Sequence, residues 1–123
     1  MKEGGVKHDS DKPQMNLLPP LALEEVAQIL TFGAKKYGSH NWRGGMKWSR
    51  LTAATLRHLF AFIRGEDLDP ESGRSHIAHA ACNLMFLLEF IKLKEYSRFD
   101  DRYKSNLGFD NLERLRPHGE PEL

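Results

Sequence analysis

The chain has 123 residues, the length of about one domain, and its 18 Lys and Arg nearly balance its 17 Asp and Glu. This balance argues against a protein built mainly to bind nucleic acid, and a hydrophobic content of 40% argues against a disordered chain. A single cysteine, Cys82, excludes an intramolecular disulfide and fits a reducing compartment, so we expect a cytoplasmic protein.

The N-terminal part of the chain is predicted to be an arm followed by a helix. Residues 1–20 show neither helical nor strand periodicity and end in two prolines, which favour a helix start. Apolar residues then recur at helical spacing up to Gly38, a natural stop, so the sequence predicts a first helix over 21–37. The loop 39–48 holds two tryptophans and adjacent glycines, which indicates a loop packed against another part of the protein.

Two further helices are predicted after this loop. The second covers about 49–64, with Ser49 as its N-cap. An acidic turn over 66–73 leads into a third helix, which starts near 72–75 and runs to about residue 96. The charged remainder, 97–123, is predicted as a short extra helix or an ordered arm with a loose terminus.

The fold prediction is therefore all-α, with a helical core over 21–96 between the extended N-terminal arm and the charged C-terminal arm or tail. No strand-like alternation or internal repeat persists along the sequence. The longest apolar run is far too short to span a bilayer, and the first residues lack the apolar run of a signal peptide. We expect no membrane segment.

A histidine and a row of arginines stand out on the second predicted helix. His58 lies in a stripe of small residues, which admits a ligand or allows tight packing around a hydrogen-bonded histidine. Arg50, Arg57 and Arg64 are seven residues apart and drift by only about 20° per step. They are either an ordinary solvated face or a basic stripe that holds phosphates, because guanidinium groups match phosphate oxygens.

The third predicted helix carries three polar side chains on one face, His76, His79 and Asn83. Its other residues are mostly apolar, and a buried polar group without a partner costs about 1–3 kcal/mol. A metal ion or a bound substrate would supply the partners, and a buried hydrogen-bond network is the alternative.

The acidic turn places Glu66, Asp69 and Glu71 within six residues. Such carboxylates could ligate a hard divalent cation such as Mg²⁺ or Mn²⁺. Alternatively, Asp69 caps the third helix with Pro70 at its first position. Both roles are compatible.

The loop after the first helix offers a stacking surface and amide edge for a nucleobase, or else is a packed structural loop. Its candidate residues are Lys35, Lys36, Tyr37, Asn41, Trp42 and Arg43.

Several motifs occur in an order that resembles the phage-associated dATP/dGTP diphosphohydrolase family. The resemblance covers roughly residues 6–95. The motifs are Lys7-x-Asp9-x-x-Lys12-Pro13, Leu18-Pro19-Pro20, Phe32-Gly33-Ala34-Lys35-Lys36-Tyr37-Gly38, Asn41-Trp42, Arg57-His58, Gly65-Glu66-x-x-Asp69-Pro70-Glu71-Ser72-Gly73 and His76-x-x-His79-Ala80.

The resemblance implies cleavage of dATP and dGTP to the monophosphate and pyrophosphate with a divalent metal, in phage nucleotide-pool remodelling and hence in the host cytoplasm. It also implies a MazG-like bundle of three to five helices, completed as a homodimer or homotetramer. The sequence departs from the acidic MazG-type pattern, because Glu24-Glu25-x-x-Gln28 lacks the third acid and His76-x-x-His79 stands where acids are expected.

The combined prediction is a nucleoside triphosphate pyrophosphohydrolase that uses Mg²⁺ or Mn²⁺ and a purine deoxynucleoside triphosphate. The predicted metal ligands are Glu66, Asp69, His76 and His79, and the predicted catalytic residues are Glu66, Glu71 and His58. The predicted substrate-binding residues are Lys12, Lys35, Lys36, Tyr37, Asn41, Trp42, Arg57, Arg64 and Asn83.

Two other function classes use the same features. A binding module would sequester a nucleotide or a nucleotide-derived signal without cutting it. A nucleic-acid-binding protein would use the tryptophans with Lys35, Lys36, Arg43 and Lys47, but the balanced net charge weakens this reading.

Overall fold

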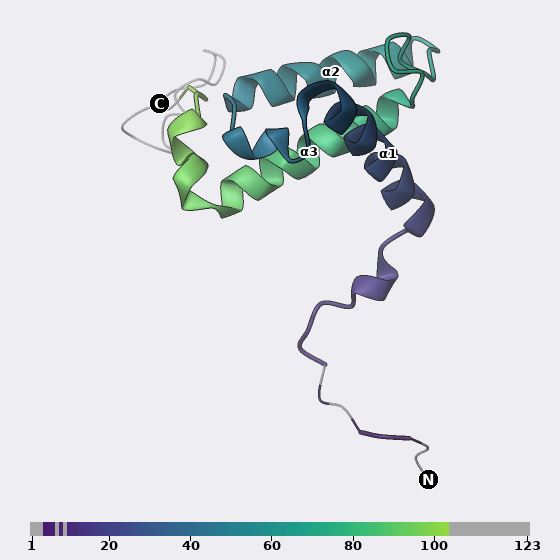
Figure 1. The fold of residues 1–123 in the computed structure, drawn as a ribbon, viewed down its shortest axis with the longest axis vertical. Helices are drawn as coiled ribbons and strands as arrows, with labels where there is room; N and C mark the ends of the chain where they lie inside the picture. The colour runs from purple at the N-terminus through teal and green to yellow at the C-terminus, as the bar shows by residue number, and fades with distance from the viewer. Residues whose placement is uncertain (1–3, 7, 9, 104–123) are drawn as a thin grey trace, which may run out of the picture.

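The computed structural model describes residues 4–6, 8 and 10–103, and this part of the chain is helical without strands (Figure 1). The α-helices are α1 (Pro20–Tyr37), α2 (Trp48–Ile63) and α3 (His76–Lys92). Short 3-10 helices are η1 (Met15–Leu17), η2 (Asn41–Gly44) and η3 (Lys94–Phe99). The all-α prediction is confirmed.

The three α-helices form a hairpin with one helix across it. Figure 1 shows α2 and α3 running side by side in opposite directions, and α1 packs against α3. The N-terminal arm, with η1 in it, projects away from these helices (Figure 1). Of the predicted C-terminal tail, residues 104–123 lie outside the described residues.

The first two helices begin and end for identifiable reasons. α1 has Pro20 at its first position and stops at Gly38, which takes the positive φ of 96° that glycine tolerates. Its prediction is confirmed to within a residue. The prediction of Ser49 as the N-cap of α2 is wrong, because α2 begins one residue earlier, at Trp48. The Asp101 carboxylate accepts hydrogen bonds from the Ser49 backbone N–H and hydroxyl instead.

Helix α3 begins as predicted but ends early. The Ser75 hydroxyl accepts hydrogen bonds from the backbone N–H groups of Ile77 and Ala78, each at 3.1 Å. The helix stops at Lys92 instead of residue 96, because Leu93 is extended (φ −107°, ψ 112°) and turns the chain into η3. The alternative in which Asp69 caps α3 is wrong, since this helix starts seven residues later.

Two apolar clusters hold the helices together. The first joins Val26 and Ile29 of α1 to Ala78 and Cys82 of α3. The second gathers Trp48, Leu51, Phe90 and Tyr96, with Trp42, Met46, Phe86, Leu87 and Phe99 packed around them. The second cluster ties the loop after α1 to the hairpin, because the Tyr96 hydroxyl donates a 2.7 Å hydrogen bond to the carbonyl oxygen of Arg43. This packing gives the loop a fixed position beside α2 and α3.

Among the described residues, no helix combines the length and the apolar character that crossing a membrane requires.

A Gly45→Ala substitution is expected to destabilise the protein by about 2–4 kcal/mol. Gly45 has φ +82°, and a Cβ there would fall on the ring of Phe99. Urea denaturation of both proteins measures the loss. Gly44→Ala is the matched control, because a Cβ at Gly44 meets nothing within 4 Å. Equal destabilisation by the two variants would contradict the packing described here.

Candidate functional site

A cavity of about 750 Å³ opens between the C-terminal half of α1, the loop after it, and one face of the α2–α3 hairpin. Small-molecule sites in proteins typically measure about 300–1,000 Å³. The hairpin contributes Ala54, Arg57 and His58 from α2 and His79 and Phe86 from α3. Ala54 precedes Arg57 and His58 by three and four residues, and His79 precedes Phe86 by seven, so each set lies toward one side of its helix.

Three histidines meet beside this cavity, and two of them, His58 and His79, line it. The Nδ1 atoms of His58 and His76 face each other across 2.8 Å, and the rings of His58 and His79 stack at 4.5 Å with an interplanar angle of 4°. His76 is buried, with 3% exposure, whereas His58 and His79 are half-buried. The two helices therefore bring together imidazoles that lie 18 residues apart in the sequence.

The turn between α2 and α3 supplies the carboxylates beside these rings. Glu66 Oε1 lies 2.7 Å from His76 Nε2, on the side of the ring away from His58. Asp69 Oδ2 lies 3.8 Å from His79 Nε2. His58, Asp69 and His76 each place a ligand atom within 4.8 Å of the others.

Ser72 connects the turn to α3. Its hydroxyl lies 2.7 Å from His79 Nε2, and its backbone N–H donates a 3.1 Å hydrogen bond to Asp69 Oδ2. The same hydroxyl accepts from the backbone N–H of Arg74 at 3.1 Å. Ser72 thus orients both a carboxylate and an imidazole of the site.

Backbone hydrogen bonds fix the shape of this turn. The Asp69 N–H donates to the Arg74 carbonyl and the Gly73 N–H donates to the Asp69 carbonyl, both at 2.7 Å. Gly73 adopts φ +70°, which closes the turn. The His76 N–H donates to the Asp67 carbonyl at 2.9 Å, so the first residue of α3 is tied to the turn as well.

The environment keeps two imidazoles neutral and the carboxylate charged. Burial lowers the pKa of His58, and nearby His79 lowers it further. Burial also lowers the pKa of His79, partly offset by Asp69. Partial burial would raise the pKa of Asp69, but the hydrogen bonds from Ser72, together with electrostatic attraction to the His79 and His58 rings, outweigh burial and lower that pKa. Near pH 7 the site therefore holds a carboxylate beside uncharged imidazoles, which can act as ligands or as proton acceptors.

The metal-free protein is expected to lose stability as the pH falls below about 6.5, the ordinary pKa of histidine. The lowered pKa values of His58 and His79 mean that the unfolded chain takes up protons before the folded chain does. Stability present above about pH 6.5 is then lost as the pH falls through the folded pKa values. Urea denaturation in chelator at about pH 7.5 and 5.5 measures this loss, and His79→Gln is expected to reduce it. His8→Gln, in the arm, is the control; a pH dependence unchanged by His79→Gln would contradict the assignment.

The structure brings most of the predicted site residues to the cavity. Besides Asp69, His58 and His79, the cavity is lined by predicted residues from α1, the loop and both hairpin helices: Lys36, Tyr37, Asn41, Trp42, Arg57, Glu71 and Asn83. His76 reaches the same cluster through His58. The chemistry expected from the second and third helices is therefore concentrated in one place.

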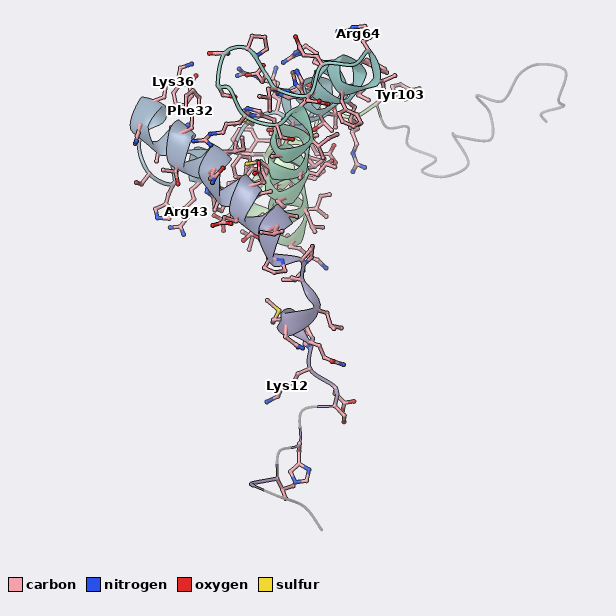
Figure 2. All side chains as sticks on the ribbon, turned by 90° about the vertical axis from the view of Figure 1, so that its right-hand side faces the viewer. Lys12, Phe32, Lys36, Arg43, Arg64 and Tyr103 are labelled. Carbon is pink, nitrogen blue, oxygen red and sulfur yellow. The ribbon has the colours of Figure 1, made fainter. Side chains whose placement is uncertain are left out.

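Other predicted residues are not at the cavity. Lys12 lies on the projecting arm, and Arg64 is the C-cap residue of α2; both are labelled in Figure 2. Lys35 is exposed on α1 and does not line the cavity, unlike its neighbour Lys36. Of the predicted arginine stripe, only Arg57 lines the cavity. The structure therefore does not bring Lys12, Lys35 and Arg64 to this cavity, and their place in a substrate site stays a prediction.

Two cavity residues are also engaged with protein groups. Lys36 Nζ forms a 2.8 Å ion pair with Glu71 Oε2, which links α1 to the turn between two exposed side chains. The Trp42 ring stacks on Phe86 at 5.5 Å, with Arg43 on it at 5.5 Å. Trp42 therefore packs the loop against α3. This agrees with the alternative prediction that the loop after the first helix is a packed structural loop.

Sequence reasoning missed Ser72 and Phe86. An aspartate followed three residues later by serine is a turn pattern in which the carboxylate accepts the serine N–H, and this signal could have identified Ser72. Phe86 lies seven residues after His79, so helical periodicity alone puts it on the same face.

Comparison with known proteins gives two similarities. The family model described as dATP/dGTP diphosphohydrolase, N-terminal, matches residues 2–102. A protein named dATP/dGTP diphosphohydrolase from Salmonella phage PMBT28 is 41% identical over 98 residues, which are 80% of this chain and 33% of that protein. The chain thus spans about a third of the length of this curated relative. No solved structure matches the chain.

Proposed function

The chain belongs to the dATP/dGTP diphosphohydrolase N-terminal family, and from this premise we propose that it hydrolyses purine deoxynucleoside triphosphates to the monophosphate and pyrophosphate. One observation carries the proposal: a cluster of imidazoles and a carboxylate adjoins a cavity of nucleotide size that Arg57 also lines. The name of the phage relative supports the substrate class. Such an activity would lower the dATP and dGTP content of the nucleotide pool of an infected cell, and we include this role in the proposal.

A divalent metal ion held by His58, Asp69 and His76 would neutralise phosphate charge and lower the pKa of a bound water. The chemistry of these donors fits such an ion, since two are imidazole nitrogens and one is a carboxylate oxygen.

Within this cavity Arg57 is placed to hold the phosphate chain, because its guanidinium can pair with two phosphate oxygens at once. His79 is neutral near pH 7 and is oriented by Ser72 and Asp69. We therefore propose that His79 is the general base that accepts a proton from the attacking water. Water adds to the α-phosphorus, the bond to the bridging oxygen breaks, and pyrophosphate leaves beside Arg57.

The aromatic and amide side chains that line the cavity suit a nucleobase. Phe32 and Phe86 supply apolar ring surface, and the amides of Asn41 and Asn83 can form hydrogen bonds with a base edge. Trp42 supports this surface through its stacking on Phe86.

The proposal is tested by incubating the protein with dATP, dGTP, dCTP and dTTP in Mn²⁺ and measuring pyrophosphate. We expect release from dATP and dGTP and much slower release from the pyrimidine nucleotides. Absence of metal-dependent turnover of all four would remove the proposal.

We also propose that copies of the chain associate through the face of the hairpin that lies opposite the cavity. Leu56, Phe60 and Ile63 of α2 are exposed and share one helix face. A corresponding exposed row on α3 consists of Ile77, Leu84, Leu88 and Ile91. Each row lies about half a helical turn away from the cavity-lining residues of its own helix, so a second copy related by a two-fold axis could cover both rows together.

A Phe60→Glu substitution is expected to shift the protein from dimer to monomer in light scattering at micromolar concentration. Phe60 is 52% exposed in the single chain and would become buried on association. Leu21→Glu makes the same change at an exposed position on α1, outside this face, and is expected to leave the dimer intact. A wild-type protein that is monomeric at this concentration would contradict the proposal.

A further inference from the structure

The donor atoms of the cluster point to a particular class of ion. Two of the three candidate ligands are imidazole nitrogens, from His58 and His76, and the third is the carboxylate of Asp69. Imidazole suits later transition metals such as Co²⁺ and Zn²⁺, whereas Mg²⁺ is bound mainly through carboxylates, phosphates and water. An ion bound here would therefore differ from one held by an all-acidic site.

The separation of the imidazole nitrogens also fits one shared ion. Two nitrogen ligands about 2.1 Å from an ion, at a right angle, lie about 3.0 Å apart. The Nδ1 atoms of His58 and His76 are 2.8 Å apart, so a small ring movement suffices. His76 is already fixed by burial and by the backbone hydrogen bond to Asp67.

Glu66 explains why His76 would offer its Nδ1 atom. The Glu66 carboxylate only accepts hydrogen bonds, so at 2.7 Å it requires a proton on His76 Nε2. A neutral His76 then has its lone pair on Nδ1, directed at His58. A carboxylate behind a metal-binding histidine is the usual arrangement that fixes its tautomer and raises its basicity.

We propose that His58, His76 and Asp69 bind a transition-metal ion in preference to Mg²⁺, and that Glu66 is a positioning residue that acts through His76. This inference deepens the proposed function by naming the cofactor class, and it assigns Glu66 a place behind the ligands.

Metal binding can be measured without any nucleotide. Chelator-treated protein is titrated with Co²⁺, and the visible absorption of Co²⁺ together with calorimetry reports the binding. We expect a stoichiometric visible band, and a dissociation constant for Co²⁺ at least about tenfold lower than for Mg²⁺. Equal binding of Mg²⁺ and Co²⁺, or no visible band, would overturn the proposal.

Variants separate the role of each carboxylate. Glu66→Gln is expected to raise the Co²⁺ dissociation constant by about 10–100-fold while keeping the visible band. Asp69→Asn, which removes a ligand charge, is expected to change the band as well as the affinity. His40→Asn, at the cavity rim and outside the cluster, is the control and should bind Co²⁺ like the wild type. Circular dichroism verifies that each variant is folded, and a Glu66→Gln affinity equal to wild type would contradict the positioning role.

The two proposals can fail separately. Hydrolysis that continues in excess chelator would contradict the metal site and leave the hydrolase intact. Tight Co²⁺ binding without turnover of any nucleotide would contradict the hydrolase and leave the metal site intact.

Discussion

A His76→Ala substitution is expected to lower kcat for dGTP by about 10³-fold. It removes one of the two facing imidazole nitrogens and leaves Glu66 without the ring that it orients. Steady-state pyrophosphate release in Mn²⁺ measures the effect.

A loss of activity in His76→Ala could also result from unfolding, because His76 is buried at the start of α3. The two causes must therefore be distinguished. Circular dichroism reports the helices, and His40→Asn is the matched control, since His40 also lines the cavity but lies outside the cluster. A folded His76→Ala protein with more than a tenth of wild-type kcat would contradict the role of the cluster.

An Arg57→Ala substitution is expected to lower kcat/KM for dATP and dGTP by about 10²-fold, with part of the loss in KM. Arg57 is the member of the arginine stripe that lines the cavity, where its guanidinium can pair with phosphate oxygens. Arg57→Lys keeps the charge but not the two-pronged geometry, so an intermediate loss is expected.

The stripe itself provides the controls for Arg57. Arg50 lies on α2 and Arg64 is the C-cap residue of this helix; both are exposed, as Arg57 is, but neither lines the cavity. Arg50→Ala and Arg64→Ala are therefore expected to change kcat/KM by less than about twofold, since surface charges are well screened. Equal losses in all three variants would instead indicate a general electrostatic effect of the whole stripe.

The fold was predictable because its signals are local. Helical periodicity, Gly38 and the Ser75 cap each act within a few residues of where the helix begins or ends. The start of α2 was not predictable in the same way. There, the Ser49 backbone N–H donates a hydrogen bond to the carboxylate of Asp101, which lies 52 residues further along the chain. No local sequence pattern predicts a contact over such a separation.

The candidate site was predictable in its chemistry more than in its geometry. His76 and His79 stood out because polar groups on an apolar helix need partners, and those partners are present in Glu66 and Ser72. The facing of His58 and His76 depends on how α2 and α3 rotate against each other, which the sequence alone does not specify. Lys12 has suitable chemistry for phosphate, but its position follows from the path of the arm.

The central claim is that this cavity cuts the bond between the α-phosphorus and the bridging oxygen of a purine deoxynucleotide. Phosphorus-31 magnetic resonance of the protein with dATP and Mn²⁺ tests it most directly, because it identifies every phosphate product in one spectrum. We predict dAMP and pyrophosphate in equal amounts, with formation lost in His76→Ala. Intact dATP that stays bound, or release of orthophosphate or triphosphate in place of pyrophosphate, would contradict the claim.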